Sequence, residues 1–166
     1  MKKIINNIKG VILAEALISV AMLIIASVAM TTVLTNAVNA TNSSKNFLIA
    51  ENLIIEGIEA VKNIRNSNWL IRPIEKECWL VPDPETLITN PANCKINLVS
   101  TEQDYQVSFD EDHWVLSAYE ANPDSDFQRK IYFSEVSEEI AIFEVHVSWD
   151  SGNKDISRKF VLHNYL

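Results

Sequence analysis

KGVILAEALISVAMLIIASVAMTTVL, residues 9–34, is the stretch that decides how the chain is organised. Over residues 11–34 it contains one ionisable side chain, Glu15, among uncharged and mostly apolar residues. About 20 such residues in a helix cross the roughly 30 Å hydrocarbon layer of a bilayer. Basic residues precede the stretch at Lys2, Lys3 and Lys9. Because positive charge stays on the cytoplasmic side of a membrane, we predict that the rest of the chain lies outside.

Two ordinary export segments explain this stretch less well. The apolar core of a cleaved secretory signal is about 7 to 15 residues long and ends in a small-residue cleavage site, whereas residues 11–34 form a longer run. A plain signal anchor explains the length and the orientation but not Glu15, because an acid inside the bilayer costs at least about 2.5 to 3.5 kcal/mol on insertion scales. We therefore look for an interpretation of residues 11–34 in which Glu15 has an interaction partner that offsets this cost.

The segment Lys9-Gly10-Val11-Ile12-Leu13-Ala14-Glu15 resembles the type IV prepilin signal, in which a short basic leader ends in Gly before an apolar helix. With Val11 as the first mature residue, Glu15 is the fifth, where the family has Glu. The resemblance implies cleavage by a membrane-embedded prepilin peptidase after Gly10, on the cytoplasmic side, and N-methylation of Val11. The chain departs from the family in having Val11 where Phe is usual, and Thr32 where major pilins often have Pro.

Residues 47–64 predict an amphipathic continuation of the helix. Apolar positions at steps of three and four share one face: Phe47, Ala50, Ile54, Gly57 or Ile58, Val61 and Ile64. The opposite face carries charge at Lys45, Glu51, Glu56, Glu59 and Lys62. We expect a helix from Val11 to about Asn66, with Gly57 either packed closely against a neighbour or merely tolerated. Residues 50–69 also resemble the second half of the helix in many minor pilins.

The C-terminal part predicts strands at 105–109, 113–118, 127–134, 140–149 and 156–163. In the fourth, Ala141, Phe143 and Val145 alternate with polar residues, as in a strand with one buried face. The turn Asp150-Ser151-Gly152-Asn153 then reverses the chain. The expected class is α+β: a long N-terminal helix, apolar in its first half and amphipathic in its second, packed on a C-terminal antiparallel sheet, as in pilins.

These features suggest three regions along the chain. Residues 1–10 are the expected leader peptide, removed by cleavage. Residues 11–36 are the expected transmembrane or filament-core helix. Residues 37–166 are the expected extracytoplasmic, pilin-like globular domain, which includes the amphipathic half of the helix.

Cys78 and Cys94 are the only two cysteines, and both lie in a proline-rich stretch, residues 72–94. An exported domain meets an oxidising space, which favours a disulfide between them. Closing a loop of about 15 residues contributes roughly 3 kcal/mol in the entropy model. Two free thiols remain the alternative, and a metal site is disfavoured because no His or second Cys pair lies near them.

Composition and motifs argue against several functions. A net charge of −8 and a pI near 4.8 do not suit nucleic acid, whose phosphates attract basic surfaces. Phosphate-binding glycine loops and nucleophile motifs are not found in the sequence. The histidines, His113, His146 and His163, fall on separate predicted strands. We expect a non-enzymatic protein without cofactor or metal.

The resemblance implies a structural subunit of a type IV pilus or pilus-like filament, and the atypical Val11 and Leu13 favour a minor subunit. Its partners would be prepilin peptidase, other pilin subunits and the inner-membrane assembly platform. It would cross the inner membrane once before assembly and then enter an extracellular or periplasmic filament. One alternative is a pseudopilin of type II secretion. Another, of a different class, is an extracellular binding domain anchored by an uncleaved helix.

Overall fold

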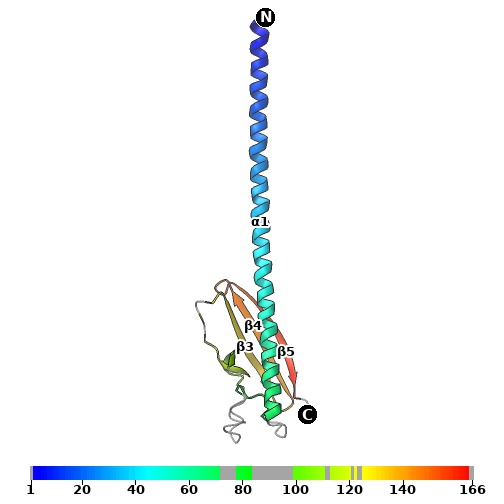
Figure 1. The fold of residues 1–166 in the computed structure, drawn as a ribbon, viewed down its shortest axis with the longest axis vertical. Coiled ribbons are helices and arrows are strands. Elements are labelled where there is room, and N and C mark those ends of the chain that lie inside the picture. Colours follow the sequence, from blue (N-terminus) through cyan, green and yellow to red (C-terminus); the bar gives the residue numbers. More distant parts are fainter. Residues whose placement is uncertain are drawn as a thin grey trace. The chain divides into compact units, whose positions relative to one another are not determined.

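The computed structural model describes residues 2–71, 78–83, 99–110, 113–120, 122 and 125–164, with side chains from Val11 onward. The chain divides into two units, Met1–Asn46 and Phe47–Leu166. Helix α1, Lys2–Ile71, passes through the boundary, and five strands follow it (Figure 1). The sheet unit therefore begins at Phe47, whereas the sequence suggested a boundary between residues 36 and 37.

Helix α1 is longer at both ends than the expected range of Val11 to Asn66. It begins at Lys2, because residues 1–10 contain no proline and their one glycine, Gly10, disfavours a helix by only about 1 kcal/mol relative to Ala. It ends at Ile71, two residues before Pro73 in the sequence. A proline disfavours helical geometry at the residue before it, which explains why the helix stops there.

The five strands form one antiparallel sheet in the order β2-β1-β3-β4-β5. Their bounds are β1 Asp104–Asp110, β2 His113–Ala118, β3 Phe127–Val136, β4 Ile140–Trp149 and β5 Lys154–His163. Each neighbouring pair in this order is antiparallel. The predicted α+β class, with one long N-terminal helix and an antiparallel sheet, is confirmed.

The core lies between one face of the sheet and the second half of α1. Residues of β4 alternate between half-buried and buried, with the odd-numbered positions from Ala141 to Trp149 buried, as their spacing predicted. Phe143 joins the core of β3 to that of β5, because its ring centroid lies 5.6 Å from that of Phe133 and 5.9 Å from that of Phe160. The strand pattern thus determines which side of the sheet receives the helix.

The helix face that meets this core is largely the predicted one. The buried apolar positions are Ala50, Ile54, Ile58, Ala60, Val61 and Ile64. Phe47, however, is 45% exposed, so its assignment to the buried face was wrong. It shares the face of Ile54, but it precedes the sheet contacts, which begin about one turn later where Arg158 of β5 reaches Glu51.

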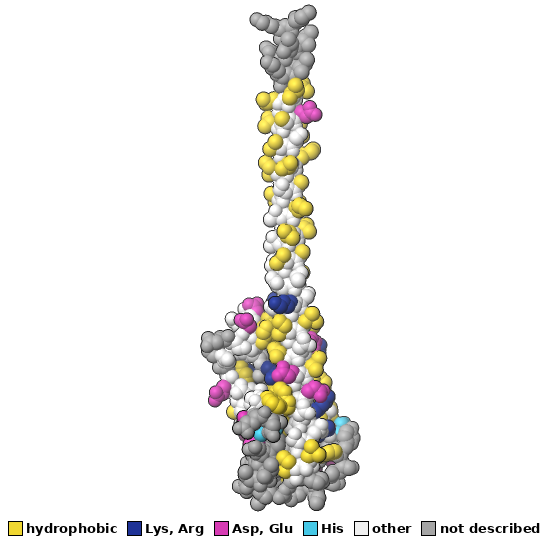
Figure 2. Space-filling model, viewed as in Figure 1, with side chains coloured by type: hydrophobic (Ala, Val, Ile, Leu, Met, Phe, Trp, Pro, Cys, Tyr) yellow, Lys and Arg dark blue, Asp and Glu magenta, His cyan; other side chains and the backbone are white. Residues whose placement is uncertain are grey.

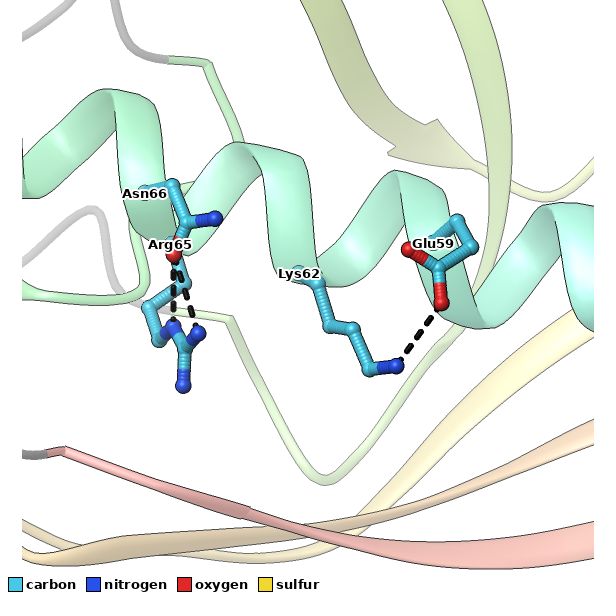
Figure 3. Close-up of polar contacts among 4 residues, drawn as sticks. All are labelled: Glu59, Lys62, Arg65 and Asn66. Carbon is cyan, nitrogen blue, oxygen red and sulfur yellow. Dashed lines mark hydrogen bonds and ion pairs between the residues drawn. The ribbon is translucent and has the colours of Figure 1, made fainter.

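Glu59 and Lys62 lie on the solvent side of the same half-helix, as predicted, whereas Glu51 and Glu56, which were placed on that side too, pair with arginines of the sheet. Lys62 pairs with Glu59 at 2.7 Å, and the guanidinium of Arg65 donates to the amide oxygen of Asn66 (Figure 3). Arg65 also reaches β5, where its Nη1 donates to the carbonyl of His163 at 3.0 Å. This contact connects the edge of the sheet to the helix.

Gly57 lies directly against side chains of the sheet. A methyl group at this position would lie 3.1 Å from Cγ1 of Val145 and 3.3 Å from Cδ of Arg129. Carbon atoms prefer separations of about 3.5 to 4.0 Å. Close packing, one of the two interpretations of Gly57, is therefore confirmed.

The β4–β5 turn uses left-handed backbone geometry at three successive residues. Asp150, Ser151 and Gly152 have φ values of 56°, 55° and 84°. The turn is closed by the N–H of Gly152, which donates to the carbonyl of Trp149 at 3.1 Å. Two successive residues with positive φ match the twist of the flanking strands, so the predicted reversal at residues 150–153 is confirmed.

Candidate functional site: the apolar half of α1

Residues 11–34 of α1 present apolar side chains to solvent, seen as yellow side chains along this stretch of the helix (Figure 2). The fourteen large hydrophobic residues between positions 11 and 34 are each more than half exposed: Val11, Ile12, Leu13, Leu17, Ile18, Val20, Met22, Leu23, Ile24, Ile25, Val28, Met30, Val33 and Leu34. A soluble monomer rarely exposes a contiguous apolar patch of more than a few hundred Å². This segment is therefore a binding surface for an apolar environment.

The size of the hydrophobic effect decides how strongly this segment avoids water. Burying a large aliphatic side chain fully is favourable by about 1.5 to 3 kcal/mol, so transferring these half-exposed side chains is worth on the order of 20 kcal/mol in total. The single acid, Glu15, opposes the transfer by roughly 3 kcal/mol on insertion scales. The apolar term wins by a wide margin, even with Glu15 unpaired.

Length and composition make this helix capable of crossing a membrane. The most apolar 18-residue window of this helix has a mean hydropathy of 2.6, and none of that window is buried. A membrane anchor and an N-terminal signal segment both have these properties.

The predicted processing site lies inside α1. Gly10 and Val11 are consecutive helical residues, and the Val11 side chain is exposed. Glu15 lies four residues further, which is one turn and a rise of about 6 Å, and its backbone carbonyl accepts a hydrogen bond from the Ser19 hydroxyl at 2.9 Å. Among the described residues, none donates to the Glu15 carboxylate or pairs with it. The structure thus brings Val11 and Glu15 onto neighbouring turns and leaves the acid available.

Cys78 lies far along the chain from this segment, in the sheet unit. It is buried and disulfide-bonded, and no cysteine among the described residues is free. Its predicted partner, Cys94, lies outside the described residues. The bonded cysteine belongs to a short stretch, residues 78–83, that packs against the end of α1.

Asn68 holds that stretch to the helix, a role that the sequence analysis missed. Its side chain is 1% exposed, and its amide nitrogen donates to the carbonyls of Trp79 at 3.3 Å and Val81 at 3.1 Å. Next to it, the indole N–H of Trp69 donates to the side-chain oxygen of Asn164 at 2.9 Å, beyond β5. Asn68 lies four residues after Ile64, on the helix face that is otherwise apolar, and this position was the signal available in the sequence.

Two arginines on the helix-facing side of the sheet were also missed. Arg129 of β3 donates to the carbonyl of Leu53 at 3.1 Å and lies 3.3 Å from the Glu56 carboxylate. Arg158 of β5 pairs with Glu51 at 2.5 Å. In each strand, the helix-facing residues on both sides of this arginine are apolar. The sequence could therefore have shown that a charged residue occupies an inward-facing position. The two pairs connect α1 to β3 and to β5, the strands on either side of β4.

Metal-binding and catalytic constellations do not emerge from the part of the chain that the structure describes. Within it, no group of three or more His, Cys, Asp or Glu side chains could hold a metal ion. His146 contacts Asp155 at 3.2 Å, and His113 contacts Asp83 at 3.4 Å.

Comparison of the chain with protein-family models, with curated proteins and with solved structures gives no match. The features of the chain that bear on its function are therefore the exposed apolar helix over residues 11–34, its one acid, Glu15, and the domain attached to it.

Proposed function

We propose that this chain is a subunit of a type IV pilus or pilus-like filament, in the role of a minor subunit. One observation supports this most: a single acid stands five residues after Gly10 in an otherwise uncharged, fully exposed helix that continues into a folded α+β domain. A filament core of neighbouring helices provides apolar surroundings along the whole of such a segment. The attached domain remains in water, where its charged surface belongs.

Processing after Gly10 gives the acid its partner. Cleavage converts the Val11 peptide nitrogen, which is uncharged, into an α-amino group that is protonated at neutral pH. In an apolar bundle that amine and the Glu15 carboxylate are each unfavourable alone, and pairing lowers the cost of both. When the amine belongs to one subunit and the carboxylate to its neighbour, the pair fixes the axial register between helices that otherwise slide.

This mechanism couples assembly to proteolysis. The uncleaved chain has no α-amine at Val11, so it cannot form the pair and waits in the membrane with its basic leader in the cytoplasm. Prepilin peptidase then acts on the Gly10–Val11 bond, and the inner-membrane assembly platform passes the processed subunit to other pilin subunits. The final location is an extracellular or periplasmic filament.

Two other functions use the same helix differently. A pseudopilin of type II secretion would be processed and assembled by the same steps, and the observations on this chain fit it equally. A membrane-anchored extracellular binding domain would keep residues 1–10 and would need no partner for Glu15. The N-terminus of the mature protein therefore separates the filament subunit from the anchored domain.

The first experiment is intact-mass analysis of protein extracted from membranes of a host that has prepilin peptidase. The filament proposal predicts loss of residues 1–10 and one added methyl group on Val11. A Gly10→Val variant should keep its leader, because a branched side chain before the scissile bond blocks access to the peptidase. A full-length chain as the only stable form would instead favour the anchored domain.

The second experiment tests the pairing itself. Glu15→Val should leave insertion and cleavage intact, since it removes only a buried charge, yet sharply reduce the share of processed protein found in sheared filaments. Glu59→Val is the matched control, because it removes an exposed acid from the same helix beyond the apolar half. Equal incorporation of Glu15→Val and wild type would refute the pairing mechanism.

A further inference from the structure

The two edges of the sheet differ in how they are covered. Strands β2 and β5 are outermost in the order of the sheet, and β5 is the red strand in Figure 1. The N–H of Leu116 in β2 donates to the carbonyl of Pro82 at 2.9 Å, so the stretch 78–83 covers part of that edge. Among the described residues, only those of β4 make backbone hydrogen bonds to residues 155–161 of β5. The sheet therefore has one partly covered edge and one open edge, which is the free side of residues 155–161.

The open edge is long and regular. Strand β5 has ten residues and pairs with β4 over its full length without a register shift. Natural edge strands are usually short, bulged, interrupted by proline or covered, since unpaired backbone groups invite another chain. Strand β5 has no bulge against β4 and no proline, and its charged residues are the remaining safeguard of this kind. Its backbone is thus in the geometry that an added strand requires.

Alternation along β5 determines which backbone groups point away from β4. The N–H of Asn164, directly after β5, donates to the carbonyl of Glu139, directly before β4, at 2.7 Å. The carbonyl of His163 instead accepts from the guanidinium of Arg65. Because successive residues of a strand direct their N–H and C=O groups to opposite sides, even-numbered residues face β4 and odd-numbered residues face outward. The outward residues of the open edge are Asp155, Ser157, Lys159 and Val161.

Two of these residues leave their outward backbone groups without a partner. Arg158 donates to the Ser157 carbonyl at 3.2 Å, which occupies one acceptor. The described part of the chain contains no such contact for the N–H and C=O groups of Lys159 and Val161. The side chain of Val161 is also 52% exposed, on the face of the sheet away from α1. Lys159 and Val161 therefore offer two donors and two acceptors to an extended chain that lies beside them.

Charge indicates what kind of chain this edge receives. With His neutral, strand β5 contains three basic residues and one acid, although the whole protein carries a net charge of −8. Arg158 pairs with Glu51 of α1, whereas among the described residues neither Lys154 nor Lys159 pairs with an acid. Opposite charges that face each other across an antiparallel pair are favourable, and like charges are unfavourable. An acidic extended segment therefore fits this edge better than a basic one.

A second copy of this chain fits the edge less well. Antiparallel pairing of two β5 edges relates the copies by a two-fold axis perpendicular to the sheet, so the two copies of residues 47–71 run in opposite directions. Copies anchored by residues 11–34 in one membrane, in contrast, enter it from the same side. Parallel pairing brings like charges together, such as Lys159 and its counterpart. The occupant that the edge favours is therefore a segment of a different protein.

We propose that the open edge of β5 binds an extended acidic segment of another protein, which adds a strand antiparallel to β5. Strand addition of this kind takes its affinity from main-chain hydrogen bonds and its selectivity from alternate side chains. Hydrogen bonds to Lys159 and Val161 hold the segment, and acids opposite Lys154 and Lys159 fix its register. The edge belongs to the sheet unit, so the proposal does not depend on processing after Gly10 or on filament assembly.

Binding of a labelled peptide to the full chain in uncharged detergent micelles, followed by fluorescence polarisation, tests the proposal at about 0.15 M salt, where distant charges are screened. The acidic probe is Val-Val-Glu-Thr-Thr-Val-Thr-Glu, whose glutamates lie opposite Lys159 and Lys154 when it runs antiparallel to β5. The matched control peptide has Lys in place of both Glu. The acidic probe should bind at least about fivefold more tightly than the control, since each exposed ion pair contributes a factor of about two to five. Absence of binding up to about 1 mM acidic probe, or equal binding of both peptides, would overturn the proposal.

A proline on β5 distinguishes strand addition from attraction to a surface charge. Val161→Pro removes an outward N–H but no hydrogen bond to β4, so it should weaken binding of the acidic probe at least about tenfold. Val161→Thr keeps the N–H and is the matched control, which should bind as the wild type does, within about twofold. Equal affinity of Val161→Pro and the wild type would contradict strand addition.

A charge reversal tests the selectivity and leaves the ladder with β4 intact. Lys159→Glu should reverse the preference, so that the control peptide binds more tightly than the acidic probe; an unchanged preference would overturn the proposal. Urea unfolding followed by tryptophan fluorescence shows whether each variant keeps its sheet unit folded, and if Val161→Pro does not, Lys159→Glu decides. Sedimentation of the chain without peptide tests the other occupant, because a dimer that Val161→Pro abolishes would assign the edge to a second copy and refute the proposal.

Discussion

Replacing Gly57 by Ala should destabilise the sheet unit, although it improves the helix. Glycine inside a helix is less favourable than Ala by about 1 kcal/mol, so an exposed site would gain by this change. At Gly57 the added methyl group meets Val145 Cγ1 at 3.1 Å and Arg129 Cδ at 3.3 Å. Overpacking of this kind costs about 1 to 3 kcal/mol, which leaves a net loss of about 1 kcal/mol.

Neither neighbour can move away easily. Val145 is fully buried in β4, between β3 and β5, and is paired with Ile131 on one side. Arg129 is held by its contacts with the Leu53 carbonyl and the Glu56 carboxylate. The helix cannot shift either without lengthening those same contacts, so the added methyl group has no cheap way to be accommodated.

A double-mutant cycle separates the two effects. Val145→Ala alone leaves a cavity and should cost about 2 to 3 kcal/mol. In that background Gly57→Ala no longer meets the valine methyl groups, so it should stabilise by up to about 1 kcal/mol. The change of sign gives a coupling energy of about 2 kcal/mol, well above the few tenths expected for independent sites.

Urea unfolding of the full chain in micelles, followed by tryptophan fluorescence, measures these energies. All four tryptophans, at positions 69, 79, 114 and 149, lie in the sheet unit, so the signal reports that unit alone. Asn63→Ala, at an exposed helix position, is the control and should stabilise by roughly 0.5 kcal/mol. Stabilisation by Gly57→Ala in the wild-type background, with no coupling to Val145, would refute the reasoning.

Two further predictions concern polar and backbone details of the same unit. Asn68→Asp turns a carboxylate oxygen toward the carbonyls of Trp79 and Val81, so the folded state should raise the pKa of the new acid. The protonated form of this acid can still donate one hydrogen bond. The stability of the variant should therefore be highest near pH 4 and should fall as the pH rises through the raised pKa. Relative to the wild type, we expect the variant to lose about 3 kcal/mol of stability at pH 7 and about 1 kcal/mol at pH 4. Asn63→Asp in urea unfolding at both pH values is the control, and equal losses at both pH values for Asn68→Asp would contradict the prediction. Ser151→Gly should stabilise the unit by about 0.5 to 1 kcal/mol and so raise the urea concentration at the unfolding midpoint, because a φ of 55° strains a residue that has a side chain. A lower midpoint would show that the turn carries no such strain.

The strands were predictable because apolar side chains recur at every second residue, which is the period with which side chains of a strand face the same side of a sheet. In β4, each odd-numbered residue from Ala141 to Trp149 is apolar, and a period of two leaves only one face for them. The β4–β5 reversal followed from the turn residues between two such runs. The order β2-β1-β3-β4-β5 was not predicted, since alternation shows which face of a strand is buried and says nothing about its neighbours.

The wrong and missing predictions have a common cause. The sequence of one element does not show how far the element that packs against it extends. Phe47 has the correct helical spacing but lies before the sheet contacts begin, and spacing contains no information about where the partner ends. Arg129 and Arg158 occupy inward strand positions, because their long side chains reach past the core to the carboxylates of Glu56 and Glu51. A charged residue at an inward position therefore predicts a partner on the covering helix.

The site itself could be predicted from sequence because it does not depend on tertiary contacts. A helix that is amphipathic buries one face, and residues 50–68 do so on the sheet. A helix that is apolar on all sides needs apolar surroundings on all sides. Over residues 11–34 no apolar stripe prefers one direction, so packing alone gives this segment neither a preferred rotation nor a preferred depth. Glu15 is the one ionisable side chain there, so pairing of its carboxylate with a particular group is the interaction that can specify both. In the proposed mechanism, cleavage after Gly10 would create a free amine at Val11, and the amine of one subunit would be the partner for Glu15 of its neighbour.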